Sequence, residues 1–164
     1  PRRGGRRSRQ VRWAPLSRAL DPYARAVIAG SHRVHGLDLG DAVSGEVVAG
    51  VVDSDDPGWP VGRVVRGHGG WQQFTDQSPD ALSRVTAALS RPSLAMSILG
   101  MHGRTAWDGM GQQAKVREGD VVVIPAAVGG VGAMAAQLGK GAGGTTIEIT
   151  SGSGKRRNAN EAVG

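Results

Sequence analysis

The stretch from Gly119 to Lys140 constrains the fold of this chain more than any other. Four consecutive β-branched residues, Val121 to Ile124, are bounded by Gly119-Asp120 and by Pro125. This pattern predicts a short strand that is buried on both faces. A glycine cluster follows, and then a run of helix-forming residues from Ala133 to Leu138. The stretch therefore predicts a strand, a tight glycine turn and a helix.

Small residues occupy the predicted turn at a spacing of three, in the pattern Ala126-x-x-Gly129-x-x-Gly132. Small side chains at this spacing let a dinucleotide pyrophosphate approach the backbone, while the first amides of the following helix point at the phosphate charge. A tight strand-to-helix turn without a ligand is the alternative explanation. We expect a dinucleotide site, because the glycines stand between a predicted strand and a predicted helix.

Composition limits the remaining possibilities. The 164 residues suffice for one large domain or two small ones, and 27 of them are glycine, which predicts many turns. Because the chain has no cysteine, disulfides, cysteine-ligated zinc and thiol catalysis are excluded. No window approaches the roughly 18 apolar residues of a membrane helix, and no signal peptide is recognisable. We expect a soluble, cytoplasmic protein with no membrane partner.

The net charge of +6 is concentrated at the N-terminus. Beyond residue 12, the 14 remaining basic side chains balance 14 acidic ones. The composition of residues 1–10 therefore predicts a solvated, poorly ordered arginine-rich tail. A polyanion-binding arm is the functional alternative, but a neutral body argues against specific nucleic-acid binding. The six arginines that supply the excess are Arg2, Arg3, Arg6, Arg7, Arg9 and Arg12.

Residues 11–97 are predicted to form a β-rich domain. Short β-branched or alternating runs are separated by glycine-containing turns, and Asp21-Pro22 is expected to end the first strand in a turn. Such a pattern predicts a partly open barrel. The predicted strands cover residues 11–20, 43–52, 61–66 and 70–75.

Residues 98–164 are predicted to form an α/β domain. A helix is expected from Thr105 to Gln113, after a break at Gly100 to Gly103, and a second strand from Thr145 to Thr150. Gly139 within the helix of the organising stretch should cost about 1 kcal/mol relative to alanine. A complete dinucleotide-binding sheet usually has six parallel strands. The two strands found here predict an incomplete Rossmann domain, as in a truncated chain.

Five segments, which follow one another in the same order as in the family, resemble the zinc-independent medium-chain dehydrogenase/reductases. Within this family, they are most similar to the NADP-dependent alkenal double-bond reductases, which include the prostaglandin and curcumin reductases. The first resembles the branch's Leu-Ser-x-Asp-Pro-Tyr-Met-Arg with one residue extra. The chain departs from the family at Arg63, Trp107 and Gly139, where Asp, Tyr and Ala are usual. The segments are Leu16-Ser-Arg-Ala-Leu-Asp-Pro-Tyr-Ala-Arg25, Val52-Asp-Ser-Asp-Asp-Pro-Gly-Trp-Pro-Val-Gly-Arg-Val-Val65, Gly70-Trp71-Gln72, Leu99-Gly-Met-His-Gly-Arg-Thr-Ala-Trp107 and Ala126 to Lys140.

This resemblance implies a fold and an activity. The fold is α/β with a β-rich N-terminal part, in which a GroES-like partly open barrel precedes the incomplete Rossmann domain. The implied activity is NADPH-dependent reduction of the carbon-carbon double bond of a small enone or enal. Two other classes stay open, a non-catalytic remnant or subunit that binds nucleotide weakly and an arginine-armed nucleic-acid binder. A homodimer, or completion of the sheet by another chain, is expected because two parallel strands leave an unpaired edge.

The resemblance also implies where the cofactor binds. Met101 and Thr105 would lie against the nicotinamide end, although Thr105 is equally explained as a helix cap. The pyrophosphate would lie over Gly129, Gly130, Val131 and Gly132.

Cofactor preference is expected to depend on the turn after the second strand, where an acid holds a ribose hydroxyl and a cation holds a 2′-phosphate. Gly152 and Lys155 are in this turn, which contains no acid. Glu148 is at a distance from the glycines that suits an NAD-type acid, but it precedes further strand residues. The sequence therefore favours NADP over NAD.

Tyr23 is the only tyrosine, and it is the candidate catalytic residue as a hydroxyl donor to a substrate enolate. A packed tyrosine with its hydroxyl at the surface is the alternative. His32, His35 and Asp38 lack a firm further ligand, so no metal site is expected.

Overall fold

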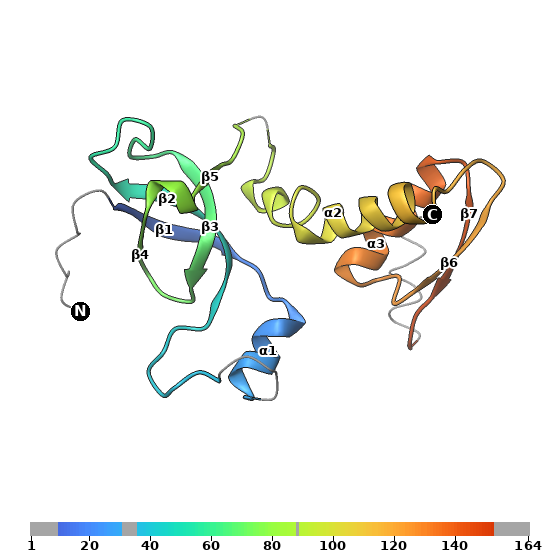
Figure 1. Cartoon of the computed structure of the whole chain (residues 1–164), viewed down its shortest axis with the longest axis horizontal. Helices are drawn as coiled ribbons and strands as arrows, with labels where there is room; N and C mark the ends of the chain where they lie inside the picture. Colours follow the sequence, from blue (N-terminus) through green and yellow to red (C-terminus); the bar gives the residue numbers. More distant parts are fainter. Residues whose placement is uncertain (1–9, 31–35, 88, 153–164) are drawn as a thin grey trace. The chain divides into compact units, whose positions relative to one another are not determined.

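The structure is a computed structural model, and it describes residues 10–30, 36–87 and 89–152 (Figure 1). The chain divides into a first unit, residues 1–96, and a second unit, residues 97–164, which are described separately below. The predicted arginine-rich tail lies outside the described residues, except for its last residue, and so does the segment that contains Lys155.

The first unit is built on a five-stranded antiparallel sheet with the strand order β4-β1-β2-β3-β5. Its longest strand, β2, arises from a β-branched run, as the sequence predicts. This sheet is the half-barrel of the expected GroES-like fold. The strands are β1 (Val11–Arg18), β2 (Ser44–Asp53), β3 (Val64–Gly70), β4 (Thr75–Gln77) and β5 (Ser83–Arg84).

The core of the first unit surrounds Trp13, which has no exposed surface. A Cβ atom on Gly69 would collide with the Trp13 indole, so the glycine makes room for the ring. Strand β2 is buried on both faces, because Val47, Ala49 and Val51 pack with Trp13 while Val48 packs with Ala95 and Met96 on the opposite side. Central position in the sheet explains this double burial.

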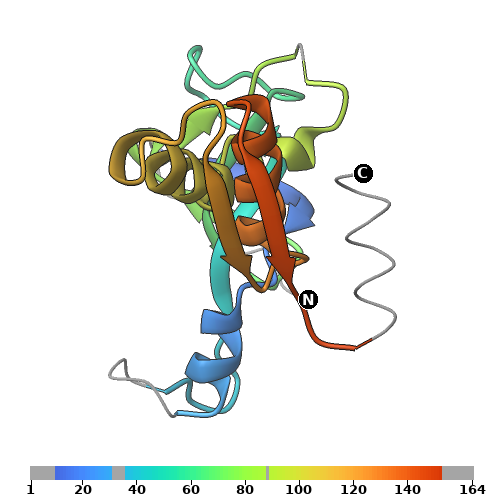
Figure 2. The ribbon, with the colours of Figure 1, turned by 90° about the vertical axis from the view of Figure 1, so that its right-hand side faces the viewer.

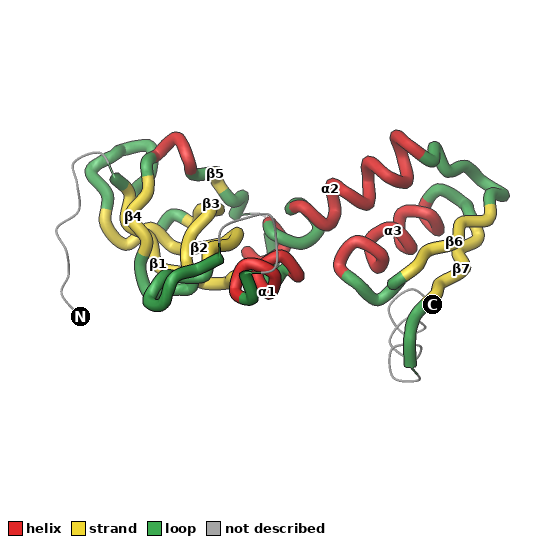
Figure 3. Tube along the Cα trace, turned by 60° about the horizontal axis from the view of Figure 1, so that its bottom comes forward, coloured by secondary structure: helices red, strands yellow, loops and turns green. Residues whose placement is uncertain are grey.

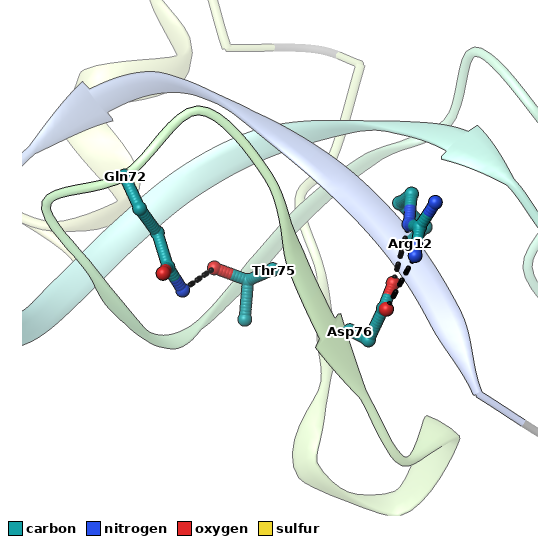
Figure 4. Close-up of polar contacts among 4 residues, drawn as sticks. All are labelled: Arg12, Gln72, Thr75 and Asp76. Carbon is teal, nitrogen blue, oxygen red and sulfur yellow. Dashed lines mark hydrogen bonds and ion pairs between the residues drawn. The ribbon is translucent and has the colours of Figure 1, made fainter. Parts of the chain in front are cut away.

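Polar contacts join the edge strand β4 to its neighbours (Figure 4). Arg12 Nε and Nη2 donate to the two carboxylate oxygens of Asp76 at 2.7 and 2.6 Å, and this paired contact raises the pKa of Arg12. Gln72 Nε2 donates to Thr75 Oγ1 at 3.0 Å, which closes the loop before β4. Both contacts are exposed, so they specify strand register more than they stabilise the unit.

Three local predictions for the first unit need correction. The second hairpin strand begins at Val64 instead of residue 61, because residues 60–63 form a turn in which Arg63 N–H donates to the Pro60 carbonyl at 3.1 Å. The third strand is β4, because residues 71–74 form the preceding loop. Asp21-Pro22 starts a helix, α1 (Pro22–Ile28), since proline in the first turn loses no hydrogen bond.

A short 3₁₀ turn, η1 (Pro79–Ala81), leads directly into β5. A second 3₁₀ turn, η2 (Pro92–Ala95), lies near the end of the first unit. Neither turn continues as an α-helix.

The second unit contains the predicted strand, turn, helix and strand. Strands β6 (Val121–Pro125) and β7 (Thr145–Ile149) pair in parallel, and helix α3 (Gly130–Gly141) connects them (Figure 2). Before β6 come helix α2 (Met101–Trp107) and a π-helical segment, Asp108–Gln113. Helices α2 and α3 lie side by side, and the alanine-rich face of α3 packs on Ile124 of β6 (Figure 3). This is the first part of a Rossmann-type arrangement.

The expectation that β6 is buried on both faces is wrong. Ile124 is buried against α3, but Val121 is 64% exposed and Val123 is 54% exposed. On β7, Ile147 is in register with Val123 and Ile149 with Pro125, and both isoleucines are also exposed. Within the described residues, α3 covers one face of this two-stranded sheet and no element covers the other.

The helix predicted from Thr105 begins four residues earlier, at Met101. Gly103 was expected to interrupt the secondary structure, but it lies inside α2. Glycine is required there because a Cβ atom would collide with the Ile98 carbonyl oxygen. Gly139 also has a packing reason, since a Cβ atom would lie 2.9 Å from Met110 Cε and 3.0 Å from Thr146 Cγ2. Alanine at position 139 would therefore combine a higher helix propensity with steric crowding. The expectation that glycine here simply costs about 1 kcal/mol relative to alanine leaves out this crowding.

Candidate functional site

The turn between β6 and α3 is held by backbone hydrogen bonds. Gly129 N–H donates to the Ala126 carbonyl at 2.8 Å, and Ala127 N–H donates to the Ile149 carbonyl at 3.3 Å. Ala126 has a φ of +52°, a left-handed conformation that is strained for any residue with a side chain. The turn is therefore tied to the end of β7 and carries local strain.

Glycine at two positions of this turn permits a close backbone approach. A Cβ atom on Gly132 would collide with the Ala126 carbonyl oxygen and lie 2.9 Å from the Ala127 Cα. A Cβ atom on Gly129 would lie 3.1 Å from the same carbonyl. Alanine at position 132 would have to displace backbone, which cannot rotate away as a side chain can.

The start of α3 presents open backbone donors. Gly129 is the N-cap and provides no side-chain cap, and the first turn contains no acidic residue. The first amides of a helix have no partner within it, and the helix dipole places partial positive charge there. An anion such as a pyrophosphate can be bound at this position. Together, the turn from Ala126 to Gly129 and the first turn of α3 are here called the glycine cradle.

The residues expected under the pyrophosphate lie together in the structure. Gly129 caps α3, while Gly130, Val131 and Gly132 form its first turn. Gly129 and Gly130 are exposed, and Val131 and Gly132 are partly buried. Whether they bind a cofactor stays a prediction.

The other expected cofactor residues are placed as follows. Met101 and Thr105 are exposed on α2, one helical turn apart, on the helix that packs beside α3. Gly152 is exposed just after β7 with a φ of +80°, so it provides the turn at the strand end. Lys155 lies outside the described residues, and Glu148 is partly buried on β7, paired in register with Ile124.

Tyr23 lies on α1 of the first unit, with 44% of its surface exposed. A partly exposed tyrosine can present its hydroxyl to a ligand or only to solvent. Its catalytic role therefore stays a prediction.

His102 is a candidate that the sequence reasoning missed. It lies on α2, and a Cβ atom on Gly130 would be 2.8 Å from its Cδ2 and 3.0 Å from its Nε2. The imidazole thus lies directly against the first residue of α3. No sequence pattern around His102 predicts this position, which arises from the packing of α2 on α3.

Other kinds of site receive no support from residues 10–30, 36–87 and 89–152. No group of three or more His, Asp or Glu side chains among them is arranged to hold a metal ion. His32 and His35 fall outside these ranges. None of the helices in this part of the chain is long and apolar enough to cross a membrane.

Comparison with known proteins gives consistent matches. Residues 8–85 match a family described as the N-terminal domain of oxidoreductase. The chain is 34% identical to the NADPH-dependent curcumin reductase of Escherichia coli (strain K12) over 94% of this chain and 45% of that protein. It is 37% identical to prostaglandin reductase 1 of Oryctolagus cuniculus over 80% of this chain and 37% of that protein.

Among solved structures, CurA from Vibrio vulnificus in complex with NADPH has a TM-score of 0.84 and 28% sequence identity. The match covers 96% of this chain and 47% of that protein. The chain therefore spans less than half the length of these relatives.

Proposed function

We propose that this chain is an NADPH-dependent reductase of the medium-chain dehydrogenase/reductase family, in the branch of the curcumin, prostaglandin and alkenal reductases. The proposed substrate is a small α,β-unsaturated carbonyl compound, whose carbon-carbon double bond is reduced. Three relatives support this proposal by name, as reductases of curcumin, prostaglandin and 2-alkenals.

The glycine cradle is the observation that carries the proposal. Its glycines leave positions 129, 130 and 132 without side chains, and Gly132 lets the start of α3 lie close against the backbone of the turn. The uncapped start of α3 adds backbone donors with no competing acid nearby in that turn. A dinucleotide pyrophosphate fits both features, because it needs a close backbone approach and carries negative charge.

The chain's own residues would bind and orient the cofactor and stabilise the charge that develops on the substrate. When bound, NADPH supplies a hydride to the double bond. The amides of Gly130 and Val131 would hold the pyrophosphate, and Met101 and Thr105 would orient the nicotinamide end. Tyr23 would donate a hydrogen bond from its hydroxyl to the carbonyl oxygen, where negative charge develops.

The test separates binding from catalysis. NADPH fluorescence is titrated with the full chain, and NADPH consumption is then measured with curcumin and with a 2-alkenal. We expect saturable binding and enone-dependent consumption, and a loss of turnover of about a hundredfold for Tyr23→Phe with unchanged NADPH affinity. Absence of NADPH binding would refute the proposal, whereas unchanged turnover in Tyr23→Phe would refute only the role of Tyr23.

Nucleotide binding without turnover is the second candidate. The exposed side chains of Val121, Val123, Ile147 and Ile149 favour it, because the interior strands of a dinucleotide-binding sheet are covered on both faces. In that case the chain would act as a subunit that dimerises or pairs with another chain. NADPH binding with no consumption, together with a dimer in analytical ultracentrifugation, would support this candidate over the enzyme.

A further inference from the structure

The imidazole of His102 forms one side of the glycine cradle. Three consecutive ring atoms, Cγ, Cδ2 and Nε2, would lie 3.0, 2.8 and 3.0 Å from a Cβ atom on Gly130. Since a carbon-carbon single bond adds about 1.5 Å, Nε2 is within about 4.5 Å of the Gly130 Cα. Any side chain at position 130 would displace this ring edge.

We propose that His102 contacts the dinucleotide phosphate and donates a hydrogen bond from Nε2 to a pyrophosphate oxygen. The inference rests on the proposed function, because it assigns a residue to the same cofactor site. The CurA relative, which matches 96% of this chain, was solved with NADPH bound, and this supports the cofactor site on which the inference rests. His102 is therefore a candidate binding residue beyond the backbone amides.

The chemistry of the ring suits this position. Nε2 carries an N–H in imidazolium and in one of the two tautomers of neutral imidazole, and hydrogen bonds to charged acceptors are roughly twice as strong as neutral ones. The ring is partly buried between α2 and α3, so fewer rotamers compete with the one that faces the phosphate. Packing against Gly130 holds the donor next to the first amides of α3.

A purely structural role is the competing explanation, in which His102 only fills space above Gly130. The two explanations differ in what replaces the histidine. His102→Gln keeps an N–H donor at a similar distance from the backbone, whereas His102→Ala removes both the donor and the volume. His102→Leu keeps the volume and removes the donor.

The experiment titrates NADPH and NADH against the wild-type chain and these three variants at one fixed salt concentration, with fluorescence as the readout. Because both nucleotides share the pyrophosphate, we expect His102→Ala and His102→Leu to weaken both by the same factor, about tenfold to a hundredfold. His102→Gln should recover part of the loss. The matched control is Lys140→Ala, which removes a cation near the far end of α3, about 15 Å away along the helix.

A second readout follows the ring itself. The chain has four histidines, and the imidazole signals of His102 are identified in ¹H–¹⁵N spectra by their absence in His102→Leu. Addition of NADPH should shift these signals, and circular dichroism should show that the variants remain folded. Wild-type affinity in His102→Leu with unshifted signals would overturn the inference while leaving the proposed function intact. If the wild type bound neither nucleotide, both would fail.

Discussion

Strands β2 and β6 are both runs of β-branched residues, yet they are buried differently. Strand β2 is covered on both faces, by the Trp13 core on one side and by Ala95 and Met96 on the other. Strand β6 buries Ile124 and exposes Val121 and Val123. The comparison shows that an apolar run marks a strand but does not reveal how many layers pack on it.

The glycines of the two units also serve different purposes. In the first unit, Gly69 makes room for a large side chain, the Trp13 indole. In the second unit, Gly132 allows two backbone segments to approach each other at the glycine cradle. The first unit is thus organised around a packed core, and the second around an open backbone surface.

The first prediction tests the core of the first unit. Trp13→Ala should lower the free energy of unfolding by about 3–5 kcal/mol, because it removes a fully buried indole and leaves a cavity. The loss comes from packing, since the indole Nε1 has no hydrogen-bond partner among the described residues. Chemical denaturation measures it, and Trp71→Ala, which replaces a partly exposed tryptophan, is the control. Equal effects of the two substitutions would contradict a core organised around Trp13.

The second prediction concerns cofactor preference in the second unit, and it rests on the sequence because Lys155 lies outside the described residues. Lys155→Glu should weaken NADPH binding by about 2–3 kcal/mol, since an attraction to the 2′-phosphate becomes a repulsion. NADH binding should change little. Titration of both nucleotides at one salt concentration measures the difference, and equal losses would show that Lys155 only supports the fold.

The third prediction tests the close backbone approach at the glycine cradle. Gly132→Ala should destabilise the chain by about 1–3 kcal/mol and weaken NADPH about tenfold, because the new Cβ atom meets the Ala126 carbonyl and the Ala127 Cα. Gly141→Ala is the matched control on the same helix, where a Cβ atom meets nothing within 4 Å. That control should raise stability by up to about 1 kcal/mol. If Gly132→Ala were more stable than Gly141→Ala, the close backbone approach at Gly132 would be disproved.

The fourth prediction tests the strain in the same turn. Ala126→Gly should stabilise the chain by about 0.5–1 kcal/mol, because glycine adopts a φ of +52° without the penalty of a Cβ atom. Thermal unfolding measures the change. Ala135→Gly, in the middle of α3, is the control and should destabilise by about 1 kcal/mol or more. Destabilisation by both substitutions would mean that Ala126 is not strained.

Local sequence patterns were sufficient to predict the strand, turn and helix around the glycine cradle. The β-branched run at Val121–Ile124, the glycines and the following helix formers each restrict backbone conformation within a few residues. For the same reason the long strand β2 was predicted within one residue of its observed ends. The family resemblance was likewise visible in short segments, and the comparisons confirm it.

Tertiary packing decided what these local patterns could not express. The continuous apolar run of β6 says nothing about whether a second layer exists, so the exposure of Val121 and Val123 followed only from the arrangement of α3 on one face. The glycines at positions 103 and 139 looked like helix breakers until their neighbours, Ile98, Met110 and Thr146, were known. His102 meets Gly130 only because α2 packs on α3. Contacts between residues far apart in the chain depend on three-dimensional packing, and a single sequence carries no periodic signal for them.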